Sequence, residues 1–175
     1  TLKPAGTPNP NPAKRGGLPV FEDDRARLRL TPRHYAYLRM SEGCNQGCTF
    51  CTIPSIRGPM RSKPVEQILA EGKELAADGA VELNLIGQDT TSYGEDLGIR
   101  DGLALLMGRL AQIETPLQKW VRFLYCYPNR ITPKLLETIA EHAALVKYID
   151  MPLQHASGNV LKRMKRGSNG DFFLK

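Results

Sequence analysis

Strand-like and helix-like segments alternate four times along this chain, and that alternation limits the folds open to it. Short runs with strand patterning cover residues 35–40, 81–86, 120–127 and 146–151. The segments that follow them carry apolar residues every three or four positions, which is typical of helices with one buried face. Strand–helix alternation predicts an α/β fold with a parallel sheet and right-handed crossovers. Four such units amount to half of an eight-unit barrel.

Capping and helix-ending residues lie where this interpretation needs them. Pro64 suits the first turn of a helix, and Gly79 favours its end. Thr132 followed by Pro133 is typical of a helix start. We expect Ser157 to cap a short last helix.

The first 24 residues differ from the rest of the chain. Residues 1–20 contain five prolines and three glycines, with no apolar periodicity. We therefore expect a linker or disordered arm over 1–24 and a folded core over 25–175. The first residue is Thr1 rather than methionine, so we expect a fragment or a processed piece.

Composition narrows the environment and the partners. The chain is 41% hydrophobic, and it has neither an apolar run of membrane-spanning length nor a visible signal peptide. Three of the four cysteines are clustered, which is unlike a disulfide framework and indicates a reducing compartment, the cytoplasm. The net charge of +6 is concentrated at the two ends. Basic residues such as Lys162, Arg163, Lys165 and Arg166 either steer the chain toward RNA or a ribosome or form solvated surface.

The clustered cysteines follow the first predicted strand. Cys44, Cys48 and Cys51 lie within eight residues, so one loop offers three thiolates to one inorganic centre. Zinc ions and iron–sulfur cubanes normally take four protein ligands, and a set of three leaves one coordination position for a substrate. The alternative is a structural zinc site with His34 or Cys126 as the fourth ligand.

This cysteine spacing, with Phe50 directly before the last cysteine, resembles the signature of radical S-adenosylmethionine enzymes. The resemblance implies that the cysteines bind three irons of a [4Fe–4S] cluster. The fourth iron then takes the amino and carboxylate groups of S-adenosylmethionine, which yields a 5′-deoxyadenosyl radical. Cores of this family are partial barrels of six βα units. The chain is therefore expected to be a truncated, TIM-like partial barrel of about four units.

Ligands of parallel α/β folds bind at the carboxyl ends of strands, which directs attention to the loops there. Gln88 and Asp89 follow the second strand, where the family binds the amino group of S-adenosylmethionine; alternatively, Asp89 caps the next element. Gln154 follows the fourth strand and is expected to hydrogen-bond the ribose. The predicted cofactor-binding residues are thus Phe50, Gln88, Asp89 and Gln154. No catalytic side chain is assigned, and Cys126 is expected to be a buried strand thiol.

Longer segments are similar to the methylthiotransferase family. They cover residues 30–38, 41–45, 51–58 and 151–157. Gln88-Asp89-Thr90 resembles the branch that adds a methylthio group to the β-carbon of an aspartate in small-subunit ribosomal protein twelve. The branch that modifies tRNA adenosine usually carries asparagine in place of Asp89. That tRNA activity, or a non-catalytic zinc- or RNA-binding module, stays as an alternative.

The resemblance also implies parts that these 175 residues do not supply. A second [4Fe–4S] cluster needs three further cysteines in an N-terminal domain, but only Cys126 lies outside the first set. An RNA-binding-type β-barrel and an electron donor such as a flavodoxin-like protein are implied as well. We therefore expect an internal piece of a longer enzyme, with the second cluster present only in the full-length parent. Alone it should not transfer a methylthio group.

Overall fold

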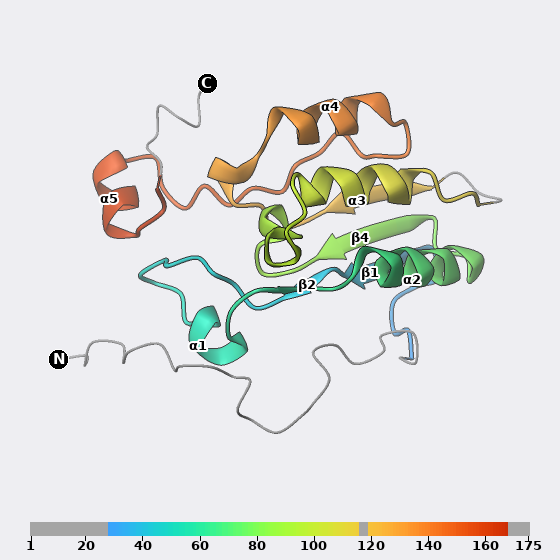
Figure 1. Cartoon of the computed structure of the whole chain (residues 1–175), viewed down its shortest axis with the longest axis horizontal. Coiled ribbons are helices and arrows are strands. Elements are labelled where there is room, and N and C mark those ends of the chain that lie inside the picture. The colour runs from blue at the N-terminus through green and yellow to red at the C-terminus, as the bar shows by residue number, and fades with distance from the viewer. Residues whose placement is uncertain (1–27, 116–118, 168–175) are drawn as a thin grey trace.

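The computed structural model describes residues 28–115 and 119–167 (Figure 1). The predicted arm over 1–24 lies outside the described residues. The strands and α-helices of the described residues, in chain order, are β1 (Tyr35–Arg39), β2 (Ser41–Glu42), α1 (Ile53–Arg57), β3 (Arg61–Ser62), α2 (Val65–Ala77), β4 (Glu82–Ile86), α3 (Gly102–Ala111), β5 (Trp120–Phe123), α4 (Pro133–Glu141) and α5 (Gly158–Arg163). Three single 3-10 turns lie between them: η3 (Thr90–Ser92), η4 (Glu95–Leu97) and η5 (Pro128–Arg130).

The main sheet is parallel and has the strand order β1-β4-β5. Leu38 pairs with Leu85, and Leu85 pairs with Phe123, so the register stacks apolar residues across the sheet. Strands of a parallel sheet are covered by the helices that connect them. α3 packs against both α2 and α4, which places the three helices side by side over the strands (Figure 1). This arrangement confirms the predicted α/β class with a partial, barrel-like core.

The fourth predicted strand, over residues 146–151, is wrong as a continuous strand. None of residues 146–151 is in a strand; an isolated bridge between Val121 and Leu145 and a hydrogen bond from the Val146 amide to the Val121 carbonyl, at 3.0 Å, join the start of this segment to β5. β5 itself ends at Phe123, before the predicted end at residue 127, because Tyr125 adopts a φ of 64°. A non-glycine residue in the left-handed region turns the chain and breaks a ladder of hydrogen bonds. The two segments meet again at Asp150, whose carboxylate accepts from the Tyr125 amide at 2.8 Å and whose carbonyl accepts from the Cys126 amide at 3.0 Å.

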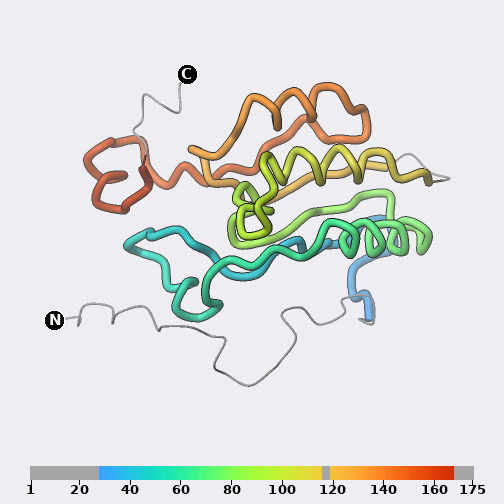
Figure 2. Tube along the Cα trace, viewed as in Figure 1, coloured from blue at the N-terminus to red at the C-terminus, as the bar shows by residue number. Residues whose placement is uncertain are grey.

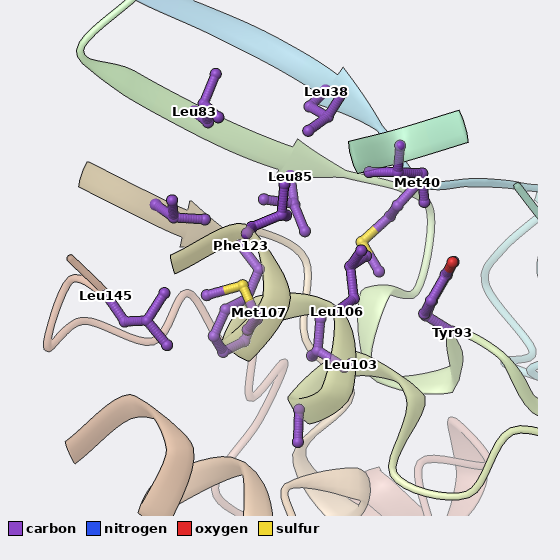
Figure 3. Packing of buried hydrophobic residues seen from close by; sticks show 14 of the residues in the cluster. Leu38, Met40, Leu83, Leu85, Tyr93, Leu103, Leu106, Met107, Phe123 and Leu145 are labelled. Atoms are coloured by element: carbon purple, nitrogen blue, oxygen red, sulfur yellow. The ribbon is translucent and has the colours of Figure 1, made fainter. Parts of the chain in front are cut away.

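The hydrophobic core lies between the sheet and its helices (Figure 3). Leu83, Leu106 and Phe123 are fully buried there. Gly72 lies inside α2, where glycine costs about 1 kcal/mol relative to alanine. A side chain at this position would begin 3.0 Å from Leu110, so glycine lets α3 approach closely. The core therefore fixes the strands in register and their carboxyl ends at one edge.

Helix starts follow the sequence signals in part. Thr132 caps α4, since its hydroxyl accepts from the Leu135 amide at 3.2 Å. Ser157 precedes α5 but makes no side-chain cap. Across the described ranges, no helix combines the length and the apolar character needed to cross a membrane.

Candidate metal centre

The loops at the carboxyl ends of the strands come together at one end of the molecule. The cysteine loop, residues 43–52, follows β1 and β2, and residues 87–89 follow β4. Figure 2 shows the cysteine loop (cyan) and α5 (red) at this same end. Chain segments more than 100 residues apart are in direct contact, because the Thr49 hydroxyl donates to the Arg163 carbonyl at 3.0 Å. The fold thus collects side chains from several loops at the edge where ligands of parallel sheets bind.

The base of the cysteine loop is closed by backbone contacts. β2 and β3 pair antiparallel, which brings the two ends of the loop together. Gly43 has a φ of 81°, and a Cβ there would lie 2.3 Å from the Pro59 carbonyl oxygen, so only glycine fits. The Cys44 amide donates to Gly58 at 3.2 Å, and the Asn45 side chain accepts from the Met60 amide at 3.0 Å. The loop is therefore held at its ends while its middle projects.

A carboxylate bridges the two sides of this base. Glu42 is largely buried and accepts from Arg39 at 3.2 Å and from Arg57 at 3.0 Å. Arg57 belongs to α1, the helix that follows the cysteines, whereas Arg39 belongs to β1. The ion pairs thus join the strand before the loop to the helix after it.

All three loop cysteines are free thiols. Cys44 is buried, and Cys48 and Cys51 are partly exposed. Burial raises the pKa of Cys44, and the nearby charges of Asp89, Cys48 and Cys51 raise it further. The Gln46 amide, which donates to the Cys44 sulfur at 3.4 Å, lowers the same pKa. Because these anions disfavour a thiolate, a cationic centre is the partner that would favour ionisation.

The described residues hold no preformed site for a single metal ion. Within residues 28–115 and 119–167, no three His, Cys, Asp or Glu side chains converge on a point that a single ion would occupy. A tetrahedral zinc site needs four ligands at about 2.0–2.3 Å from one ion. His34 precedes β1 and so lies at the opposite end of the strand, roughly 17 Å away at about 3.4 Å per residue. In a cubane each thiolate binds a different iron, so three separated thiols on one loop suit it.

Asp89 connects the loop after β4 to the cysteine loop. Its carboxylate accepts from Gln46 at 2.7 Å, from Thr91 at 2.6 Å and from Ser92 at 2.7 Å. Only 2% of Asp89 is exposed. Three donors leave about one of the four acceptor positions of a carboxylate free. The predicted contact of Asp89 with a cofactor is untested, but its contact with the cysteine loop is a role that the sequence did not indicate.

The neighbouring Gln88 is different. Its carbonyl oxygen Oε1 is buried and has no hydrogen-bond partner among the described residues. A buried acceptor without a donor is costly, so this atom suits a donor that comes from a bound group. That Gln88 binds a cofactor stays a prediction, and the buried, unpaired oxygen is a physical reason for it.

Phe50 and Gln154 both lie on the surface of this region. Phe50 is 50% exposed, and every residue from 151 to 157 is exposed. Gln154 has a φ of 71°, a strained conformation that recurs at binding sites. Within the part of the chain that the structure describes, no contact places either side chain against the cysteines, and their cofactor roles stay predictions.

Sequence reasoning missed two residues of this site, Tyr127 and Arg166. Arg166 is one of the four basic residues near the C-terminus, but it is 6% exposed and its guanidinium carbon lies 4.2 Å from the ring centroid of Tyr127. Burial raises the pKa of Tyr127, Arg166 lowers it, and the charges of Cys48, Asp89 and Cys44 raise it. The cysteine loop, the loop after β4 and the segments around Tyr127 and Arg166 therefore share one electrostatic environment. Nothing in the sequence distinguishes Arg166 from its exposed basic neighbours.

Comparison with known proteins gives one family and a group of relatives. The model of the Radical SAM superfamily matches residues 38–175. A ribosomal protein uS12 methylthiotransferase RimO from Solibacter usitatus (strain Ellin6076) is 63% identical over 156 residues, which are 89% of this chain and 34% of the relative. The protein of the same name from Koribacter versatilis (strain Ellin345) is 54% identical over 156 residues, 89% of this chain and 31% of its own length. The chain thus spans about a third of these relatives.

Solved structures share the fold at low sequence identity. The cobalamin-dependent S-adenosylmethionine radical enzyme OxsB aligns with a TM-score of 0.60 and 18% identity, over 78% of this chain and 20% of that one. The radical S-adenosylmethionine methyltransferase TsrM from Kitasatospora setae, solved with cobalamin and a [4Fe-4S] cluster, aligns with a TM-score of 0.57 and 17% identity, over 77% and 26% of the two chains. These likenesses concern the fold alone.

Proposed function

Because this chain belongs to the radical SAM superfamily, we propose that Cys44, Cys48 and Cys51 bind three irons of one [4Fe–4S] cluster. The observation that carries the proposal is the presence of three free thiols on one loop at the carboxyl end of β1. The fourth iron is then left for the amino and carboxylate groups of S-adenosylmethionine. When bound, this pair supplies a 5′-deoxyadenosyl radical that removes a hydrogen atom from an unactivated carbon.

The protein's own residues would position these groups. Gln88 offers its unpaired buried carbonyl oxygen to an N–H of the amino group of S-adenosylmethionine. Asp89 holds Gln46 and keeps one acceptor position for the same amino group. We assign Gln154 to the ribose hydroxyls, and Phe50 to cover the third cysteine and exclude water.

We further propose that the complete polypeptide transfers a methylthio group to the β-carbon of an aspartate in ribosomal protein uS12. Support comes from relatives of that name at 54–63% identity over 89% of this chain. The second [4Fe–4S] cluster, which carries sulfur to the substrate, belongs to parts of the relatives that this chain does not span. A flavodoxin-like electron donor and a cytoplasmic location are consistent with a ribosomal substrate and a reduced cluster.

A contact with ribosomal RNA is supported by the charge on and directly after α5. Lys162, Arg163 and Lys165 are exposed beside the cysteine loop. Phosphates bind such groups in a salt-dependent manner. Arg166 is buried, so it takes no part in this surface.

The cluster is tested by anaerobic reconstitution of the complete polypeptide that contains these residues, followed by iron and sulfide assays. We expect about four irons per cluster site, lost when any one of Cys44, Cys48 or Cys51 becomes alanine. Cys126→Ala serves as the matched control, because Cys126 is 2% exposed and lies in the core cluster. Stoichiometric zinc without iron would show that the assignment is wrong.

The substrate is tested with reductant, S-adenosylmethionine and sulfide in the presence of either uS12 or tRNA. The proposal expects the mass of one methylthio group on an aspartate-containing peptide of uS12. Modification of tRNA adenosine with unmodified uS12 would favour the nucleic-acid branch instead. Neither product, with a cluster intact, would refute both substrates.

A further inference from the structure

The end of α5 is bonded to the cysteine loop. The Thr49 amide donates to the Met164 carbonyl at 3.2 Å, and its hydroxyl donates to the Arg163 carbonyl at 3.0 Å. Carbonyls in the last turn of a helix have no partner within the helix, so they are available to another segment. We call this pair of hydrogen bonds, between Thr49 and residues 163 and 164, the α5–loop contact.

Arg166 extends the α5–loop contact to a cysteine sulfur. Its guanidinium Nη1 lies 3.5 Å from the Cys48 Sγ, and Nη2 donates to the Pro152 carbonyl at 3.0 Å. The backbone of Arg166 is fixed too, since its carbonyl accepts from the Tyr127 hydroxyl at 2.7 Å and from Asn129 at 3.2 Å. Both ends of the residue are therefore held in place.

The Arg166 guanidinium lacks some of the hydrogen bonds and the opposite charge that a buried cation needs. Among the described residues no carboxylate forms an ion pair with Arg166, and its Nε is buried without an acceptor. Taking a charge out of water is costly unless it is paired and fully hydrogen-bonded. A protonated thiol accepts hydrogen bonds only weakly, whereas a metal-bound thiolate carries negative charge. The arrangement is thus completed when Cys48 is a thiolate ligand.

We propose that Arg166 is a positioning residue for the metal centre, holding the Cys48 sulfur through a charge-assisted hydrogen bond and raising the reduction potential of the cluster. This inference rests on the proposed cluster at Cys44, Cys48 and Cys51. Hydrogen bonds to ligand sulfurs set cluster potentials, because they stabilise the more negative, reduced state. The α5–loop contact holds the same ligand from the backbone side.

The test is a redox titration of the reconstituted complete polypeptide, followed by electron paramagnetic resonance. Arg166→Gln should shift the one-electron reduction equilibrium about tenfold against reduction, which is about 59 mV more negative. Arg166→Lys keeps the positive charge but loses the two-pronged guanidinium, so its potential should lie between those of Arg166→Gln and wild type. Lys162→Gln removes one exposed charge from α5, four residues before Arg166, and is the matched control, with no shift expected.

A second measurement does not depend on a bound cluster. Amide hydrogen exchange of the metal-free protein should show faster exchange at Thr49 in Arg166→Gln than in Lys162→Gln, with the core strands unchanged. If Arg166→Gln does not fold, Arg166→Lys and Thr49→Val carry the comparison, and unchanged exchange of the amide at position 49 in both overturns the proposal.

The outcomes separate this inference from the proposed function. A wild-type protein without a cubane refutes the proposed function. A normal cubane whose potential is equal in wild type, Arg166→Gln and Lys162→Gln overturns the role of Arg166 and leaves the cluster in place. Weaker binding of S-adenosylmethionine at an unchanged potential also overturns it, because Arg166 would then serve the cosubstrate.

Discussion

Replacing Asp89 by alanine removes the carboxylate that joins the loop after β4 to the cysteine loop. Three donors lose their acceptor at once: Gln46, Thr91 and Ser92. Gln46 and Thr91 are partly exposed and can turn to water, but Ser92 is 2% exposed and stays buried. The variant therefore perturbs both the stability of the core and the position of the cysteine loop.

The size of the effect follows from these contacts. A hydrogen bond to a charged group contributes about 1.5–3 kcal/mol, and the three are not additive since they share one carboxylate. With two donors rehydrated, we expect a loss of about 3–4 kcal/mol. Against a total free energy of unfolding of about 5–15 kcal/mol, this loss is large. Asp89→Asn keeps one acceptor oxygen and should lose about half as much.

The assay is urea unfolding of the metal-free complete polypeptide, followed by circular dichroism. At about 1–3 kcal/mol per molar urea, the midpoint should fall by roughly 1–4 M in Asp89→Ala. Glu137→Ala, at an exposed position on α4, is the control and should change little. A loss below about 1 kcal/mol would refute the reasoning that Asp89 holds the cysteine loop. Weaker binding of S-adenosylmethionine in such a stable variant would make Asp89 a cofactor ligand only.

Two further predictions concern the base of the cysteine loop and the buried thiol of Cys126. Gly43→Ala should abolish cluster loading while Gly47→Ala keeps it, because a Cβ at Gly43 meets the Pro59 carbonyl whereas Gly47 has open space. Iron content after reconstitution measures the loading, and equal loading of the two variants would contradict the prediction. Burial raises the pKa of Cys126 from 9.0 to about 12. Between these values the folded chain keeps a proton that the unfolded chain loses, so stability falls as pH rises, by about 1.4 kcal/mol per unit. Denaturant titrations at pH 9 and pH 10 should show this fall in wild type but a smaller one in Cys126→Ala, and identical slopes would contradict the prediction.

Periodicity and turn residues predicted the elements whose structure depends mainly on neighbouring residues in the sequence. The first two strands, the helix after Pro64 and the cysteine loop occur within a few residues of where periodicity and turn residues place them. The strand over 146–151 was wrong because alternating residues there meet a neighbour that turns away at Tyr125. A left-handed tyrosine leaves no mark in a sequence, so the sequence could not reveal that the ladder breaks.

The site divides in the same way. Cys44, Cys48 and Cys51 are adjacent in sequence, and their spacing alone indicated a shared centre. Arg166 reaches Cys48 only because the sheet returns the chain to the same edge. Its burial is a tertiary property, and a run of basic residues gave no reason to separate it from its neighbours. Contacts of this kind become visible only once the strands are in register.

The α5–loop contact also orders events during synthesis. Thr49 and its acceptor Arg163 are 114 residues apart, so at about 5–20 residues per second the loop waits about 6–23 s for its partner to be translated. β1, β4 and their helices can pack within that interval, since small domains fold in microseconds to seconds. Until α5 emerges, the middle of the loop has its thiols but not its anchor. Iron delivery that begins before then would meet a binding loop closed only at its base, which makes the emergence of α5 the natural checkpoint for maturation.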